Sequence, residues 1–176
     1  DLSYNDISDI SILKELSNLL QLDLGNNKIS DISSLKKFLN LTRLDLGNNR
    51  ISDIGILNNL SNLRELSLNS NKISNISNLN DLPNLEYLYL SFNQLTEING
   101  LKTLPSLTTL SLASNKISNI SDLNDLPSLT ELDLSSNQLR EIKGLKNIIN
   151  LRKINLENNN ISNISSLQEL KNIESV

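Results

Sequence analysis

The sequence repeats with a period of 22 residues, and no other feature constrains the fold as strongly. An asparagine marks the same position in every unit of the repeat. These asparagines are Asn5, Asn27, Asn49, Asn71, Asn93, Asn115, Asn137 and Asn159. Leucine or isoleucine keeps register with them along the whole chain, and no insertion breaks the phase. The chain is therefore predicted to consist of one small structural unit used again and again.

The spacing of the apolar residues changes within each unit. In one unit they fall at Leu63, Leu66, Leu68, Ile73, Ile76, Leu79 and Leu82. The step of two residues from Leu66 to Leu68 is that of a short β-strand, whereas the later steps of three suit tight turns of the 3₁₀ type. One such coil cannot bury its apolar side alone, so the coils must stack and their strands must form a parallel sheet. We therefore expect Leu66, Leu88 and Leu110 to share one interior column.

The repeated asparagine lies where the chain leaves the strand and the backbone loses its sheet partners. A buried peptide group without a hydrogen bond costs roughly 1–3 kcal/mol, and an inward asparagine offers two N–H donors and an oxygen acceptor. We expect these side chains to bond the backbone of neighbouring coils, which is a structural role and not a catalytic one.

Composition excludes several classes of function. The chain has no His and no Cys, so it lacks the commonest general base, every imidazole-based triad and the usual zinc ligands. We therefore expect no enzymatic activity, no cofactor and no metal site. A net charge of −4 without a basic run argues against a nucleic-acid partner. Polar residues interrupt the apolar ones throughout, so membrane insertion is not expected either.

The ladder L-x-x-L-x-L-x-x-N resembles that of the leucine-rich-repeat family along essentially the whole chain. The arcs Ile29–Leu35 and Ile73–Leu79 resemble the bacterial internalin repeat, whereas Leu95–Leu101 and Leu139–Leu145 resemble the repeat of a phosphatase regulatory subunit. The resemblance implies an α/β solenoid, a right-handed horseshoe with a concave parallel β-sheet and a convex side rich in 3₁₀ helices and turns. It implies a protein-binding role and no particular ligand.

The chain is predicted to be a single domain, residues 1–176, of about eight coils. It begins at Asp1–Asn5 and ends at Ile173–Val176 within predicted strands, and neither end shows the cap that family members usually have. We expect a piece of a longer protein, with adjoining domains or caps on the same chain. Resemblance to the internalin repeat favours localisation on a bacterial surface or secretion. Resemblance to the phosphatase-regulator repeat favours localisation in the cytoplasm.

Two segments of 44 residues, 71–114 and 115–158, match at more than half of their positions and so act as controls for each other. Positions that both copies keep serve the scaffold, and positions that differ are free for other roles. The first copy has Tyr87, Tyr89 and Phe92 where the second has Glu131, Asp133 and Ser136. The scaffold therefore does not require these rings.

Strand alternation places Tyr87 and Tyr89 together on the concave face, with Phe92 just beyond the strand end. Their predicted neighbours are small or polar, so the rings should be exposed, and exposed aromatic rings on a rigid sheet are typical anchors of protein interfaces. The predicted partner-binding residues are Tyr87, Tyr89, Phe92, Glu65, Ser67, Arg43, Thr109, Ser111, Glu131 and Asp133.

The sequence is compatible with other roles for the aromatic rings, for the acidic residues and for the whole chain. Phe92 could fold back against the solenoid edge, leaving the tyrosines as ordinary β-surface residues. Asp23 and Asp45 should align on adjacent strands with Asp1 beside them, and this acidic row could bind a metal, face a basic partner patch or be solvated. The second functional hypothesis is a sensor or scaffold segment of a larger intracellular protein, such as a GTPase, a kinase, an immune-type receptor or a phosphatase regulator.

Overall fold

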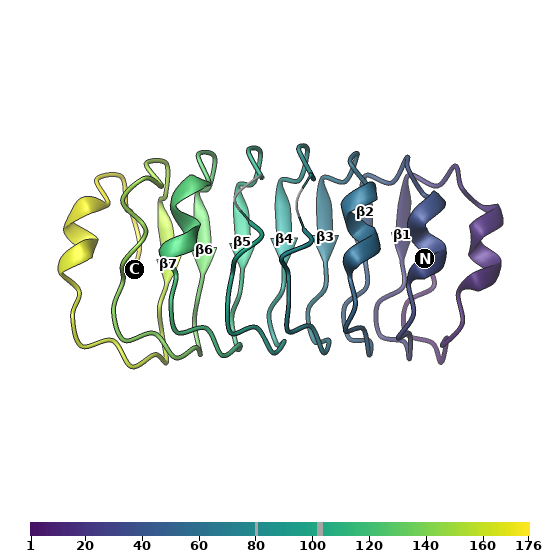
Figure 1. The fold of residues 1–176 in the computed structure, drawn as a ribbon, viewed down its shortest axis with the longest axis horizontal. Coiled ribbons are helices and arrows are strands. Elements are labelled where there is room, and N and C mark those ends of the chain that lie inside the picture. The colour runs from purple at the N-terminus through teal and green to yellow at the C-terminus, as the bar shows by residue number, and fades with distance from the viewer. Residues whose placement is uncertain (80, 102–103) are drawn as a thin grey trace.

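The computed structural model describes residues 1–79, 81–101 and 104–176 and shows an elongated right-handed solenoid of stacked coils (Figure 1). One parallel sheet runs along it, with its strands in chain order from β1 to β7. The strands are β1 (Gln21–Asp23), β2 (Arg43–Asp45), β3 (Glu65–Ser67), β4 (Tyr87–Tyr89), β5 (Thr109–Ser111), β6 (Glu131–Asp133) and β7 (Lys153–Asn155). The predicted fold class is confirmed.

The core is a set of leucine and isoleucine columns enclosed by the coils. Leu66 on β3 pairs in register with Leu88 on β4, and Leu88 pairs with Leu110 on β5. All three are almost completely buried. The predicted shared column is therefore confirmed, and it forms because a strict 22-residue period places the same side chain at the same point of every coil.

The asparagine column bonds the backbone as predicted. The side-chain nitrogen Nδ2 of Asn93 donates to the carbonyl of Leu68 in the preceding coil at 3.0 Å and to that of Leu90 in its own coil at 3.1 Å. Its Oδ1 accepts the backbone N–H of Ile73 at 3.0 Å, again in the preceding coil. The same pattern recurs at Asn49 and Asn137, so each coil is fastened to the one before it.

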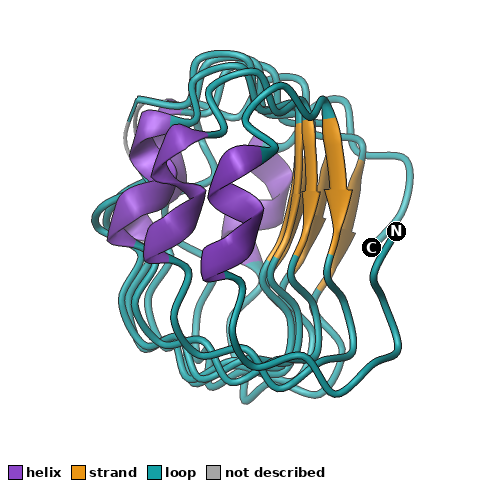
Figure 2. Cartoon of the chain, turned by 90° about the vertical axis from the view of Figure 1, so that its right-hand side faces the viewer, coloured by secondary structure: helices purple, strands orange, loops and turns teal. Residues whose placement is uncertain are grey.

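The convex side lies opposite the sheet and carries 3₁₀ helices, as Figure 2 shows. Those of the described residues are η1 (Ser11–Glu15), η2 (Ser33–Lys37), η3 (Gly55–Asn59), η4 (Ser121–Asp125) and η5 (Ser165–Glu169). The arc 73–79 has a turn and no 3₁₀ helix, although its sequence resembles that of Ile29–Leu35. Resemblance between arcs therefore does not fix their local structure.

The arcs of the phosphatase-regulator type turn at a glycine with positive φ. Gly100 has φ +141°, and a Cβ atom there would lie 2.2 Å from the carbonyl oxygen of Ile76 in the preceding coil. Gly144 has φ +101° and would bring a Cβ atom to 2.5 Å from the Cα atom of Ser121. These two glycines are required because the coils approach each other too closely for any side chain.

The two ends of the chain differ from the prediction, because neither contains a regular strand. Residues 1–5 have no strand, although the backbone N–H of Leu2 donates to the carbonyl of Asp23 at 2.8 Å. At the other end Ser175 forms only an isolated bridge with Lys153. A single neighbouring coil on one side supports pairing but not a full ladder.

A second polar ladder, which the sequence analysis missed, connects the coils on the return from the convex side to the sheet. Each of its side chains donates to a backbone carbonyl of the preceding coil, as Asn84 does to Ser61 at 3.0 Å. The other members are Asn62, Ser106, Ser128, Asn150 and Asn172. The position holds asparagine in some coils and serine in others, which hid its regularity. None of the described helices is long and apolar enough to cross a membrane.

Candidate functional site on the concave sheet

The two tyrosines of β4 point out of the sheet together. Leu88 between them is completely buried, while Tyr87 is 40% exposed and Tyr89 is half-buried. On the neighbouring strands Glu65 and Thr109 flank Tyr87, as the sequence predicts. Ser67 and Ser111 flank Tyr89 in the same way. The small neighbours leave the faces and edges of both rings accessible, with Tyr89 the more enclosed of the two.

Phe92 follows β4 and is 63% exposed, so it does not fold back against the solenoid edge. Its backbone is left-handed, with φ +58°, and the same position is left-handed in every described coil. Asn26, Asn48 and Ser136 occupy that position in other coils, and Tyr4 occupies it in the first coil. Asparagine adopts this conformation readily, whereas a bulky aromatic residue does so at a steric cost. Phe92 is therefore neither buried by the scaffold nor favoured by its backbone.

One ion pair lies on each side of the aromatic rings. Arg43 on β2 approaches Glu65 on β3 with Nη1 3.3 Å from Oε2. Lys153 on β7 approaches Glu131 on β6 with Nζ 2.8 Å from Oε1. The hydrogen bond that Lys153 donates to Glu131 raises the pKa of the lysine. Both carboxylates in this row, Glu65 beside Tyr87 and Glu131 one strand further away, are thus paired with a cation on the outer strand.

The aspartates of the second row are held by their own strand ends. Oδ1 of Asp23 accepts the backbone N–H of Gly25 at 2.9 Å, and Oδ1 of Asp45 accepts that of Gly47 at 2.8 Å. Asp133 likewise accepts the N–H of Ser135 at 2.9 Å. Asp23 and Asp45 align on adjacent strands, as predicted. Among the described residues, no three carboxylates gather as a metal site would require.

Burial raises the pKa of the Tyr89 hydroxyl, and the negative charge of Glu65 raises it further. The hydroxyl therefore remains protonated at neutral pH and available as a hydrogen-bond donor. Beside this ring the sheet is hollowed over β4 to β7, with a volume of about 490 Å³. Ser111, Glu131 and Asp133 line the hollow together with Tyr89. Lys153 and the apolar side chains of Leu110 and Leu132 line it too, so the space next to the aromatic ring combines charged and apolar groups.

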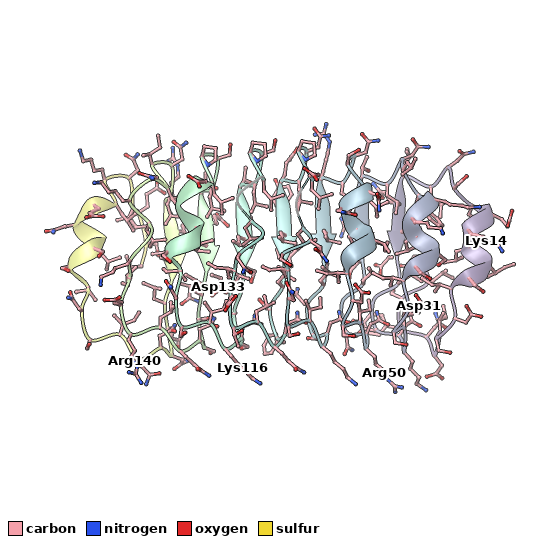
Figure 3. All side chains as sticks on the ribbon, in the orientation of Figure 1. Lys14, Asp31, Arg50, Lys116, Asp133 and Arg140 are labelled. Carbon is pink, nitrogen blue, oxygen red and sulfur yellow. The ribbon has the colours of Figure 1, made fainter. Side chains whose placement is uncertain are left out.

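The solenoid also assembles a basic row that is not visible as a run in the sequence. Lys28, Arg50, Lys72 and Lys116 occupy the position after the repeated asparagine and are exposed. Figure 3 shows Arg50 and Lys116 along one edge of the molecule, with Arg140 nearby. The basic row lies outside the strands, so it does not alter the acidic character of the concave face.

All ten predicted partner-binding residues lie on the concave sheet or at its margin, on β2 to β6 and the strand end after β4. The predicted set leaves out Asp45 and Lys153, which the strand register places on the same face. Asp45 was recognised as part of the acidic row but was not connected with the rings, from which it is separated only by Ser67. Lys153 was visible only as a charge at the rim, and its pairing with Glu131 needed the register between β6 and β7.

The family described as Leucine Rich repeats (2 copies) matches residues 1–37, 39–81, 61–103, 83–125 and 105–147, and so covers most of the chain. The chain belongs to the leucine-rich-repeat family. No curated protein sequence matches this leucine-rich-repeat chain. Solved structures that it resembles include internalins, so the predicted internalin-type character is confirmed. Internalin-like leucine-rich-repeat folds are typically binding scaffolds without enzymatic activity.

An internalin (inlF) from Listeria monocytogenes is 34% identical with a TM-score of 0.90, and the match covers 97% of this chain and 51% of that one. The leucine-rich-repeat chain thus spans about half of that internalin. Internalin C2 (inlC2) from the same organism is 31% identical with a TM-score of 0.91, covering 99% of this chain and 80% of that one. A complex of TLR13 with ssRNA13 matches at 29% identity and TM-score 0.80, over 93% of this chain and 26% of that one.

Proposed function

We propose that this leucine-rich-repeat chain binds a protein partner on its concave sheet, with Tyr87, Tyr89 and Phe92 as the anchoring side chains. Leucine-rich-repeat folds generally serve as protein-interaction modules. Large aromatic rings supply much of the buried area at protein interfaces, and each offers about 150–250 Å². The scaffold provides a rigid surface on which little conformational entropy is lost on binding.

The observation that carries the proposal is the conformation of Phe92. An exposed phenylalanine in the left-handed region contributes nothing to the core and costs about 1 kcal/mol of backbone strain, which asparagine would avoid. A residue that is unfavourable for folding and exposed to solvent is expected to serve a binding surface. Its neighbours Tyr87 and Tyr89 extend the same surface along β4.

A protein partner is favoured over a nucleic acid. TLR13 is in complex with ssRNA13, so the leucine-rich-repeat fold itself does not exclude RNA. On the present chain, however, Asp23, Asp45 and Asp133 lie on the concave face, and they would repel phosphates. The basic row lies along an edge with no aromatic residue within it on which a base could stack.

The test is selection of binders followed by removal of the rings. A phage-displayed library of random dodecapeptides is enriched on the native chain, and fluorescence anisotropy gives the affinity of an enriched peptide. Replacing Tyr87, Tyr89 and Phe92 by Ala should weaken binding at least tenfold, since anchors of this kind often contribute roughly 2 kcal/mol or more. Thermal unfolding should change little, because the rings are largely outside the core.

The matched control removes apolar side chains that are equally exposed but lie elsewhere. Leu39 is 53% exposed and Ile149 is 66% exposed, and neither lies on a strand of the sheet. Replacing both by Ala should change the affinity less than twofold. If no peptide is enriched, or if enriched peptides bind the ring-deleted variant as well as the native chain, the concave face is wrongly assigned.

A further inference from the structure

Charged and small residues are arranged symmetrically about Tyr89. In its row across the sheet, the order from β2 to β6 is Asp45, Ser67, Tyr89, Ser111 and Asp133. An aspartate thus stands two strands away from the ring on each side, with a serine between. Nothing in the 22-residue repeat demands this order, because aspartate, serine, tyrosine and asparagine all occupy this position in other coils.

The two aspartates differ from the two glutamates on the strands of this face, each of which already has a cationic partner. Glu65 is paired with Arg43, and Glu131 is paired with Lys153. Within the part of the chain that the structure describes, neither Asp45 nor Asp133 forms an ion pair. Each carboxylate is nevertheless held in place, because one of its oxygens accepts a backbone N–H at the strand end. The second oxygen of each is left for a partner.

The spacing excludes a shared ion and matches a peptide. Asp45 and Asp133 are four strands apart, which is about 19 Å at the usual distance of about 4.8 Å between strands. One cation cannot contact both carboxylates over that distance. An extended peptide rises about 3.3 Å per residue, so about six residues span the same distance. Two basic side chains six positions apart would therefore reach both aspartates.

The surface of the sheet between the tyrosine ring and the aspartates can accommodate long basic side chains. Ser111 is small, and on the Asp133 side of the ring a hollow of about 490 Å³ extends from Tyr89 past Asp133 to β7. The methylene stem of a lysine or arginine can lie along the tyrosine ring while its charged group reaches the carboxylate. Arginine fits best, because its planar group can bond a carboxylate with two N–H groups and also stack on the ring.

We propose that the partner segment bound on the concave face is basic at both ends and apolar in the middle, with two arginine or lysine side chains on Asp45 and Asp133. This inference rests on the proposed function and specifies the chemistry of its partner. The central apolar residues contact Tyr87, Tyr89 and Phe92, and the flanking charges set the position of the segment along the sheet.

The test uses the dodecapeptide library enriched on the native chain. Enriched sequences should carry arginine or lysine on both sides of an apolar residue, with the two basic residues about six positions apart. In the variant Asp45→Asn/Asp133→Asn, the affinity of such a peptide should fall at least tenfold. Asparagine keeps the side-chain oxygen that accepts the backbone N–H at the strand end, so the fold should not change. A fall in affinity would therefore report the missing negative charge.

The matched control has the same chemistry on another face. Asp31 and Asp53 each accept a backbone N–H two residues on, at 2.8 Å from Ser33 and 2.9 Å from Gly55, and both are exposed away from the strands. Asp31→Asn/Asp53→Asn changes the net charge equally and should alter the affinity less than twofold.

Two results would overturn the inference while the proposed function stands. One is enrichment of peptides that need the aromatic rings but lack paired basic residues. The other is an equal loss of affinity in the Asp45→Asn/Asp133→Asn variant and in its control, which would show a general effect of net charge. Loss of affinity on removing the two concave charges without any loss on removing the rings would instead refute the aromatic anchor.

Discussion

At the scale of single residues, the left-handed position after each strand separates scaffold needs from surface chemistry. Its backbone is the same in every described coil, and φ lies between +51° and +58° from Tyr4 to Asn158. Asparagine tolerates this conformation, while the bulky side chains of Phe92 and Tyr4 are strained in it. Sequence comparison between the two 44-residue copies identified Phe92 as unnecessary for the fold, but only the structure shows that it is unfavourable.

Phe92→Asn is therefore expected to stabilise the chain by about 1 kcal/mol, because asparagine tolerates the left-handed backbone and little apolar contact is lost. The free energy of unfolding in urea measures this effect. Ser136→Asn, at the equivalent position of the second copy, should change stability by only a few tenths of a kcal/mol. A destabilised Phe92→Asn variant would mean that the ring packs on the scaffold after all.

At the scale of the coil, the buried asparagine replaces the hydrogen bonds that the chain loses on leaving the strand. Asn93 is 8% exposed and bonds Leu68, Leu90 and Ile73. Asn159 makes the equivalent bonds but is half-buried. The cost of losing the same three bonds should therefore depend on access of water to the groups left behind.

Asn93→Ala is expected to destabilise the chain by about 2 kcal/mol or more, because the N–H of Ile73 would be left buried without a partner. The carbonyls of Leu68 and Leu90 would each lose one of their two asparagine donors and keep those from Asn71 and Asn115. Asn159→Ala should cost about 1 kcal/mol, since water can replace the lost side chain there. Urea unfolding of both variants decides the matter. Equal losses would show that the bonds themselves, rather than burial, set the cost.

Most of the coil was predictable, because a period of 22 residues fixes the register of every strand and column once one coil is understood. The alternation of Leu88 with Tyr87 and Tyr89 placed the rings on the concave face correctly. The arc 73–79 was harder, since the choice between a 3₁₀ helix and a turn depends on contacts with neighbouring arcs. The symmetric placement of Asp45 and Asp133 about Tyr89 was not predicted, because it becomes visible only when the register of five strands is combined.

At the scale of the whole molecule, stability should be uneven although the coils are nearly identical. Each coil contacts only its neighbours, so a coil with two neighbours is held more firmly than one at an end. The side chains of Leu68 and Leu90 are completely buried, whereas Ile7 and Ile161 are only partly buried. The chain as it stands is therefore expected to open from its ends.

Hydrogen exchange of one repeated amide can measure this gradient. The backbone N–H of Ile73 and that of Ile7 each donate to an asparagine Oδ1, at 3.0 and 2.9 Å. Because the bond is the same, the exchange rate should report the stability of the coil, and we expect Ile73 to exchange on the order of a hundredfold more slowly. Equal rates would indicate that the solenoid opens only as a whole.

The asparagine bonds also have a direction. The side chain of Asn27 reaches back to the carbonyl of Leu2 and the N–H of Ile7, both of which are made earlier on the ribosome. Every later asparagine does the same, so a newly synthesised coil meets acceptors and donors that are already in place. The solenoid can thus be assembled in the order of its synthesis, one coil after another, without waiting for residues still to be translated.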